Sequence, residues 1–115
     1  MPILVTGGTG LIGAQVATDL RDAGEHVVVM VRTPPAAAER AAWRAIDWHQ
    51  GDIRDPAQVG AVFEGYAIDQ VIHLAAFLQY DCETEPDNAV AVNVNGTLNL
   101  LRAARQAGVR RFVFG

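Results

Sequence analysis

The 115-residue sequence contains neither lysine nor serine, so all nine basic residues are arginine. Its one cysteine, Cys82, cannot form an intramolecular disulfide, which fits a reducing compartment such as the cytoplasm. Apolar runs such as Val27–Val31 are far too short to span a bilayer, and no basic stretch precedes an apolar one at the N-terminus. We therefore expect a cytoplasmic protein with no signal peptide and no membrane partner.

Basic charge is also scarce, because nine arginines face 13 acidic residues and the net charge is −4. The charges are scattered along the chain, which argues against a nucleic-acid-binding surface. His26 and His49 have no partner at the spacing of metal ligands, so no metal site is predicted. Half of the residues are hydrophobic, and glycine is frequent. The hydrophobic content suits a protein whose sheet is covered on both faces.

Three glycines at a spacing of three follow the first apolar run and lead directly into a helical pattern. We expect Gly7 to turn the chain off a strand, Gly10 to let a phosphate approach, and Gly13 to bring the helix close to the sheet. N–H groups of the first helical turn would then face a diphosphate. The predicted cradle comprises Gly7, Thr9, Gly10, Leu11, Ile12 and Gly13. A glycine-rich turn without a ligand is the alternative.

Strand patterns alternate with helix patterns along the whole chain. The strands are expected at residues 2–6, 27–31, 45–49, 70–75 and from 112, and the helices at 11–23, 56–64 and 86–107, with a short helical segment before Trp43. Val90, Val94, Leu98 and Leu101 share one face of the last helix. This order predicts one α/β domain over residues 1–115, a Rossmann-type doubly wound parallel sheet of strand order 3-2-1-4-5, with helices on both faces. Ligands bind such sheets at the carboxyl ends of the strands.

Four segments resemble one family and occur in its order: Thr6–Gly13, Gly51–Asp55, His73–Ala76 and Asn93–Thr97. They are similar to the N-terminal part of an extended short-chain dehydrogenase/reductase, in the NAD-dependent epimerase/dehydratase family. The resemblance implies that the chain is the cofactor-binding part of a longer enzyme, ending before the family's catalytic tyrosine and lysine. A natural or engineered half-domain is the alternative.

The resemblance also implies roles for residues outside the glycine turn. Asp52 would accept a hydrogen bond from the adenine amino group, with the Ile53 backbone beside it; a loop acid bonded within its own turn is the alternative. Leu74, Ala75 and Ala76 would pass beneath the ribose and diphosphate, unless they are only a small-residue strand end. Asn93 would support the active-site end of strand four, unless it is exposed and idle.

Arg32 follows the second strand, where NAD-preferring members of the family carry an acid that binds the ribose hydroxyls. A guanidinium suits a 2′-phosphate instead, because it is always charged and can bind two oxygens. We therefore predict NADP in preference to NAD. A solvated arginine that closes a strand is the alternative.

No residue of this chain has the family's catalytic pattern, a tyrosine with a lysine four positions later. Tyr66 and Tyr80 are followed at that spacing by Gln70 and Thr84, so no catalytic residue is assigned. His73 lies in an apolar strand and is expected to be a hydrogen-bonded core histidine.

Three functions fit this sequence. The first is the NAD(P)-binding part of an oxidoreductase, epimerase or dehydratase that transfers hydride on a nucleotide-sugar or related carbonyl or alcohol substrate. The second is an NADP-binding sensor or scaffold without turnover. The third, a flavin- or S-adenosylmethionine-binding Rossmann protein, is disfavoured by the glycine spacing and by Asp52. The resemblance further implies a homodimer built on helix 86–107.

Overall fold

The computed structural model describes residues 2–75 and 84–115, which form a five-stranded parallel sheet of order β3-β2-β1-β4-β5. This is the predicted order. The strands are β1 (Ile3–Thr6), β2 (Val27–Val31), β3 (Asp47–Gln50), β4 (Gln70–His73) and β5 (Arg111–Phe114). Thr6 at the end of β1 is in register with Met30 of β2 and His73 of β4, so the carboxyl ends of the central strands meet at one edge.

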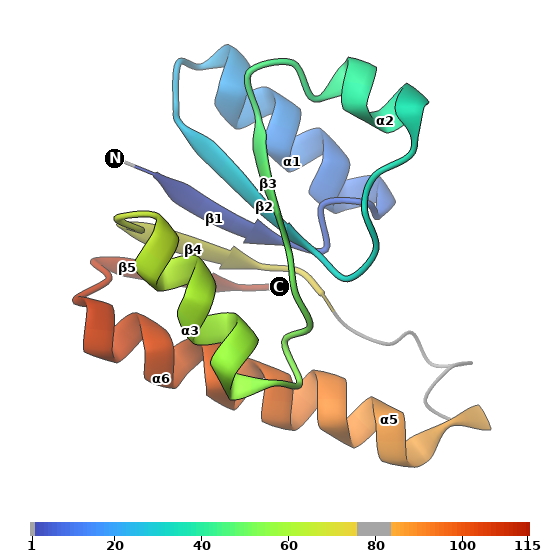
Figure 1. The fold of residues 1–115 in the computed structure, drawn as a ribbon, viewed down its shortest axis with the longest axis vertical. Helices are drawn as coiled ribbons and strands as arrows, with labels where there is room; N and C mark the ends of the chain where they lie inside the picture. Colours follow the sequence, from blue (N-terminus) through green and yellow to red (C-terminus); the bar gives the residue numbers. More distant parts are fainter. Residues whose placement is uncertain (1, 76–83) are drawn as a thin grey trace.

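Helices cover both faces of the sheet, also as predicted (Figure 1). One face carries the first two helices, and the other carries α3 and the long helical segment that begins at Pro86. The bounds are α1 (Leu11–Asp22), α2 (Ala37–Ala42), α3 (Pro56–Gly65), α5 (Pro86–Val90), η1 (Ala91–Gly96) and α6 (Thr97–Ala107). Asp55 caps α3 as its sequence predicts, because its carboxylate accepts a hydrogen bond from the Ala57 N–H at 2.9 Å.

The core has two layers because successive strand residues point to opposite faces of the sheet. In β1, Leu4 faces the layer under α3 and α6, whereas Ile3 and Val5 face the layer under α1. Each of these side chains is at most 3% exposed. The continuous apolar run of β2 divides in the same way, which explains why a parallel strand lacks polar alternation.

The third and fourth strands show the two largest differences from the predicted strand bounds. The third strand begins at Asp47 rather than at residue 45, because Ala45 has a φ of +62° and belongs to a turn that an extended strand cannot include. The fourth strand ends at His73, and Leu74 and Ala75 follow it without strand pairing. Both differences lie at element ends, where hydrogen bonding to neighbouring strands decides the boundary.

The helix predicted over residues 86–107 is helical throughout, but its middle turns, Ala91–Gly96, are π-helical. Its apolar stripe does not face the sheet: Val90, Val94, Leu98 and Leu101 are 40–54% exposed. A different set of side chains faces the sheet, with Ala89, Val92, Asn99, Leu100 and Ala104 buried. In the first helix, Ile12 is 69% exposed, and Gly13 and Ala17 are the buried residues.

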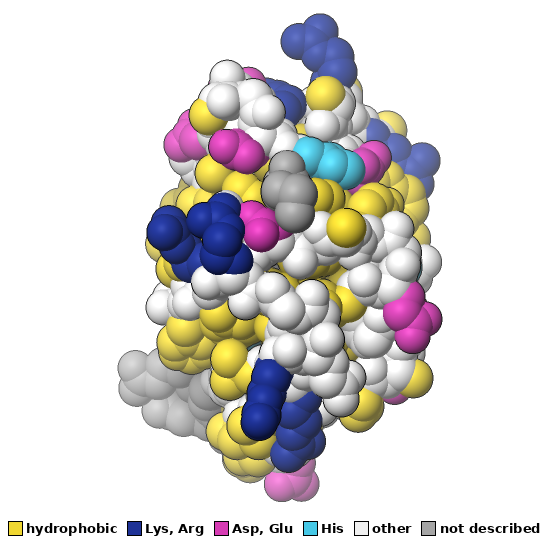
Figure 2. Space-filling model, turned by 90° about the vertical axis from the view of Figure 1, so that its left-hand side faces the viewer, with side chains coloured by type: hydrophobic (Ala, Val, Ile, Leu, Met, Phe, Trp, Pro, Cys, Tyr) yellow, Lys and Arg dark blue, Asp and Glu magenta, His cyan; other side chains and the backbone are white. Residues whose placement is uncertain are grey.

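The edge of the sheet formed by the amino ends of the strands is charged without a dominant sign (Figure 2). Arginine and acidic side chains alternate there with apolar ones. One ion pair of this edge joins Arg110, just before β5, to Asp69, just before β4, at 2.8 Å. Such a mixed surface agrees with the scattered charge of the sequence.

Candidate functional site

A cleft of about 550 Å³ lies at the carboxyl edge of the sheet, where the order reverses between β1 and β4. It is bounded by the turn after β1, the ends of β2 and β3, and the segment after β4. The lining residues are Thr6, Gly7, Gly8, Thr9, Gly10, Leu11, Ile12, Met30, Val31, Arg32, Gly51, Asp52, Ile53, Leu74, Ala75 and Val92. Ligands of open α/β sheets bind at this kind of reversal.

The turn after β1 and the start of α1 have no room for a side chain at Gly7 or at Gly13. Gly7 has a φ of +75°, and a Cβ there would lie 2.8 Å from the Ala75 N and the Leu74 carbonyl carbon. A Cβ on Gly13 would overlap the Gly7 carbonyl oxygen. Gly13 therefore makes a close approach as predicted, but it approaches the backbone of the turn after β1 rather than the sheet. The turn is packed tightly enough to bring α1 directly against the end of β1.

The amino end of α1 opens into the cleft. Gly10 caps this helix without a side-chain hydrogen bond, and no acidic residue lies in the first turn. The first N–H groups of a helix lack partners within the helix, and the helix dipole makes this end positive. Backbone donors and a positive helix end at a cleft are suited to binding phosphate.

Two charged side chains line the cleft beyond the glycine turn. Arg32 follows β2 and is exposed, and within the described residues its guanidinium has neither a hydrogen bond nor an ion pair. Asp52 follows β3, and its carboxylate is bound by Arg54. The hydrogen bonds from Arg54 hold the pKa of Asp52 below its usual value, against the opposing effect of burial, and the nearby charges of Arg54 and Arg32 act in the same direction.

A buried hydrogen-bond chain connects β1, β4 and the long helix behind the cleft. The Thr6 hydroxyl accepts hydrogen bonds from the N–H groups of Leu74 and Ala75, both at 3.1 Å, and lies 2.6 Å from His73 Nδ1. His73 Nε2 lies 2.8 Å from the Thr97 hydroxyl, which donates to the Asn93 carbonyl at 2.9 Å.

The proton positions of this chain follow from its partners. Because Thr6 accepts two backbone hydrogen bonds, its own proton goes to His73 Nδ1, and the imidazole proton is on Nε2. Burial lowers the pKa of His73. The prediction of a hydrogen-bonded core histidine is confirmed, and the neutral ring has both nitrogens satisfied.

Ten residues of the predicted site line this one cleft, and two of the described ones do not. Gly13 lies beneath the glycine turn, and Asn93 is half-buried in η1, next to Val92 of the cleft wall. Ala76 lies outside the described residues, as do Phe77, Tyr80 and Cys82. The others are Gly7, Thr9, Gly10, Leu11, Ile12, Arg32, Asp52, Ile53, Leu74 and Ala75.

The sequence reasoning missed six lining residues: Thr6, Gly8, Met30, Val31, Gly51 and Val92. The role of Gly8 is visible only in the structure, where a Cβ on it would overlap Val29 of the neighbouring strand. Val92 had no signal in the sequence either, since only the packing of the long helix brings it to the cleft.

Within residues 2–75 and 84–115, no group of three or more His, Cys, Asp or Glu side chains is arranged to hold a metal ion. The same described segments contain no helix long and apolar enough to cross a membrane.

The model of the NAD dependent epimerase/dehydratase family matches residues 3–115, nearly the whole chain. The chain belongs to this family. The matched residues include the glycine turn and the other described residues that line the cleft.

Relatives with curated names show the range of this family. A UDP-glucose 4-epimerase of Streptomyces lividans is 43% identical over 114 residues, which cover 96% of this chain and 34% of that protein. A 3 beta-hydroxysteroid dehydrogenase/Delta 5-->4-isomerase of Mycobacterium tuberculosis is 37% identical over 97% of this chain and 30% of its own length. The chain therefore spans about a third of these relatives.

A solved structure agrees with the sequence comparison. The UDP-glucose 4-epimerase of Thermus thermophilus, in complex with NAD, matches with a TM-score of 0.87 and 34% identity. The match covers 99% of this chain and 37% of the other. Membership of the epimerase/dehydratase family thus comes with its Rossmann-type fold.

Proposed function

We propose that the cleft binds a nicotinamide dinucleotide, with the diphosphate at the start of α1. Gly7, Gly10 and the first N–H groups of α1 would hold the phosphates, and Asp52 and Ile53 the adenine. The observation that carries this proposal is the glycine turn, where Gly7 and Gly13 leave no space for side chains and α1 begins without a side-chain cap. The residues present therefore fit the group that the family name implies.

The proposed reaction of the whole protein is hydride transfer on a nucleotide-sugar or a related carbonyl or alcohol substrate. When bound, the nicotinamide ring supplies the hydride donor and acceptor. The 43% identity to a protein named UDP-glucose 4-epimerase supports the sugar-nucleotide class, and the steroid dehydrogenase relative supports the wider alcohol and carbonyl chemistry. Residues 1–115 contain no lysine or serine, so we propose that the acid–base groups come from a further segment of a longer protein.

Replacing Gly10 with valine tests the phosphate site. The Gly10 backbone, at φ −76° and ψ 169°, suits any residue, and a Cβ there meets only the Gly7 carbonyl oxygen, at 3.3 Å. The fold should therefore persist while a side chain fills the mouth of the turn. We expect NADH and NADPH to bind at least about tenfold more weakly, measured by calorimetric titration.

Gly60 provides the matched control. It lies in α3, away from the cleft, and no atom lies within 4 Å of its added Cβ. Gly60→Ala should leave the dissociation constants unchanged and raise the free energy of unfolding by about 0.5–1 kcal/mol. Undiminished binding by a folded Gly10→Val variant would show that the diphosphate does not lie at this turn.

We further propose that the cleft prefers NADP to NAD through Arg32. Its guanidinium is exposed at the cleft without a protein partner among the described residues. One charge-assisted hydrogen bond contributes about 1.5–3 kcal/mol, which is roughly a 10- to 150-fold preference. An acidic residue at this position would favour the unphosphorylated ribose hydroxyls instead.

Arg32→Asp should therefore reverse the preference, raising the dissociation constant of NADPH and lowering that of NADH. Arg102→Asp is the control, because it makes the same change of charge at an exposed site of α6, outside the cleft. If both constants keep their ratio in Arg32→Asp, the preference does not come from Arg32.

A homodimer through helix 86–107 is also proposed. Val90, Val94, Leu98 and Leu101 recur every three or four residues on one helix face, and all four are exposed. A continuous apolar stripe on an amphipathic helix is typical of a helix–helix interface.

A further inference from the structure

Arg54 holds a residue of the cleft wall without lining the cleft itself. It lies in the turn between β3 and α3, and its side chain is 34% exposed. Its Nε donates to both oxygens of the Asp52 carboxylate, each at 3.0 Å, and its Nη2 donates to Oδ2 at 2.5 Å. The Arg54 backbone N–H donates to Asp52 Oδ1 at 3.0 Å as well. This one residue therefore fixes the plane of the carboxylate.

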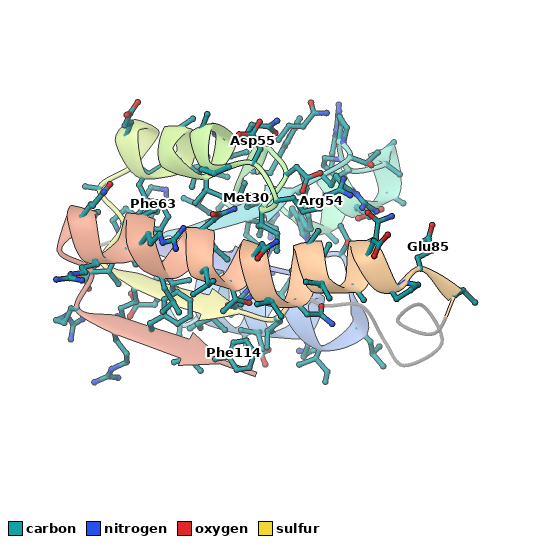
Figure 3. The ribbon with its side chains drawn as sticks, turned by 90° about the horizontal axis from the view of Figure 1, so that it is seen from below. Met30, Arg54, Asp55, Phe63, Glu85 and Phe114 are labelled. Atoms are coloured by element: carbon teal, nitrogen blue, oxygen red, sulfur yellow. The ribbon has the colours of Figure 1, made fainter. Side chains whose placement is uncertain are left out.

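The opposite side of the same guanidinium is fixed by the long helical segment. Arg54 Nη1 donates to Asn88 Oδ1 of α5 at 3.0 Å. In Figure 3 the labelled Arg54 reaches from the turn before α3 toward the helix that begins after Glu85. Asn88 thus holds Arg54, and Arg54 holds Asp52, although Asn88 follows Arg54 by 34 positions in the sequence.

This arrangement limits what the Asp52 carboxylate can bind. A carboxylate has about four acceptor positions, and the donors of Arg54 occupy most of them. Asp52 still lines the cleft, and its side chain is 21% exposed. Its carboxylate, held in one orientation, therefore keeps acceptor capacity for about one further hydrogen-bond donor from the cleft.

We propose that Arg54, held by Asn88, is a positioning residue that orients Asp52 to read the amino group of adenine. The proposal rests on the dinucleotide-binding function of the cleft. An oxo-purine such as hypoxanthine presents a carbonyl oxygen at the same ring position, and that oxygen would face the carboxylate with lone pair against lone pair. The ion pair thereby makes the cleft selective for an amino-purine.

The guanidinium of Arg54 can orient the Asp52 carboxylate in a way that a lysine side chain cannot. A planar guanidinium matches the two carboxylate oxygens and keeps a further N–H for Asn88, whereas a lysine ammonium is a point charge on a flexible stem. Arg54→Lys therefore retains the charge and loses the orientation. Asn88→Ala retains the Arg54 guanidinium beside Asp52 and removes the Asn88 oxygen to which Arg54 Nη1 donates.

The test compares NAD with nicotinamide hypoxanthine dinucleotide, in which a carbonyl oxygen replaces the amino group on C6 of the purine and the adjacent N1 carries a proton. Dissociation constants are measured by calorimetry on the intact protein, with the 2′-phosphorylated pair in parallel. We expect the wild-type protein to prefer the adenine form at least about tenfold. Arg54→Lys should reduce this ratio to about threefold or less, and Asn88→Ala should give an intermediate ratio.

Arg110 provides a matched control at the opposite edge of the sheet. Its Nε lies 3.4 and 3.2 Å from the two oxygens of Asp69, and its Nη2 lies 2.8 Å from Oδ2. Arg110→Lys breaks a similar fork away from the cleft and should leave the adenine preference unchanged, whatever it does to stability.

The outcomes separate this inference from the proposed function. If the wild-type protein binds none of the dinucleotides, the proposed function fails. If it binds them without preferring adenine, or if folded Arg54→Lys keeps or increases the preference, the role of Arg54 is wrong. Equal weakening of both purine forms also overturns it, because that is the effect of a purely structural residue. Should Arg54→Lys not fold, Asn88→Ala decides by the same ratio.

Discussion

At the scale of single residues, His73 shows how a polar group becomes part of the core. It is 1% exposed, and Thr6 and Thr97 satisfy its two ring nitrogens from β1 and from α6. Protonation would place a second donor against a Thr6 hydroxyl that already accepts two backbone hydrogen bonds. The fold therefore requires the neutral ring.

The stability of the protein should consequently depend on pH through His73. Burial lowers the pKa of His73 in the folded state, so the unfolded state takes up the proton first as the pH falls below about 6.5. The free energy of unfolding should be fully maintained above that pH and should fall below it, by at most about 1.4 kcal/mol per pH unit. Urea unfolding at a series of pH values measures this slope.

A His73→Gln variant should have a lower free energy of unfolding than the wild-type protein. It should also lose the part of the pH dependence of that free energy that His73 causes. His49→Gln is the control, because it removes a different histidine and leaves the buried chain intact. If the slope between pH 6.5 and 5 is the same in His73→Gln as in the wild-type protein, another group causes it.

At the scale of elements, the long helical segment has two unlike sides. Its inner side brings Gly96 against Ile53, where a Cβ would lie 2.7 Å from the isoleucine side chain, and Asn99 Nδ2 donates to the Ile53 carbonyl at 2.9 Å. Its outer side carries the exposed stripe that begins with Val90. Gly96 and Asn99 permit close packing against Ile53 on the inner side, while the exposed aliphatic stripe remains outside, where a partner helix could cover it.

A charge in that stripe should prevent the proposed dimer. Leu98→Glu places a carboxylate at an exposed position in the middle of the stripe, so the monomer should still fold. Sedimentation velocity should show a dimer for the wild-type protein and a monomer for the variant. Gln106→Glu, at an exposed position near the end of the same helix, should remain dimeric. An unchanged sedimentation coefficient for Leu98→Glu would exclude this face as the interface.

At the scale of the whole molecule, the two edges of the sheet have different roles. The carboxyl edge gathers the glycine turn, Arg32 and Asp52 around the cleft, and the amino edge carries structural ion pairs such as Asp69–Arg110. The outermost strand β5 keeps Phe114 66% exposed, and Figure 3 shows this side chain at the open side of the sheet. The cleft and the Asp69–Arg110 ion pair are therefore spatially separate, so substitutions at one edge can be compared with controls at the other.

The strand order and the cleft were predictable because their signals are local. Apolar runs separated by amphipathic helices permit few arrangements of a parallel sheet, and right-handed crossovers select one of them. The glycine spacing marks the turn because only glycine fits where Gly7 and Gly13 lie. Residues that follow strands, such as Arg32 and Asp52, then had to meet at one edge of the sheet.

The contacts made across the sequence were not predictable in this way. The apolar periodicity of residues 86–107 identified the helix but did not show that the stripe of Val90, Val94, Leu98 and Leu101 faces outward, because periodicity does not name the partner of a face. Nor did spacing connect Arg54 to Asn88, or His73 to Thr97, since these pairs lie 34 and 24 positions apart. The sequence by itself determined the order of elements and the chemistry at the strand ends, where sterics and hydrophobicity act locally. Only the tertiary structure decided which side chains hold those groups in place, because that depends on distances between elements that fold against one another.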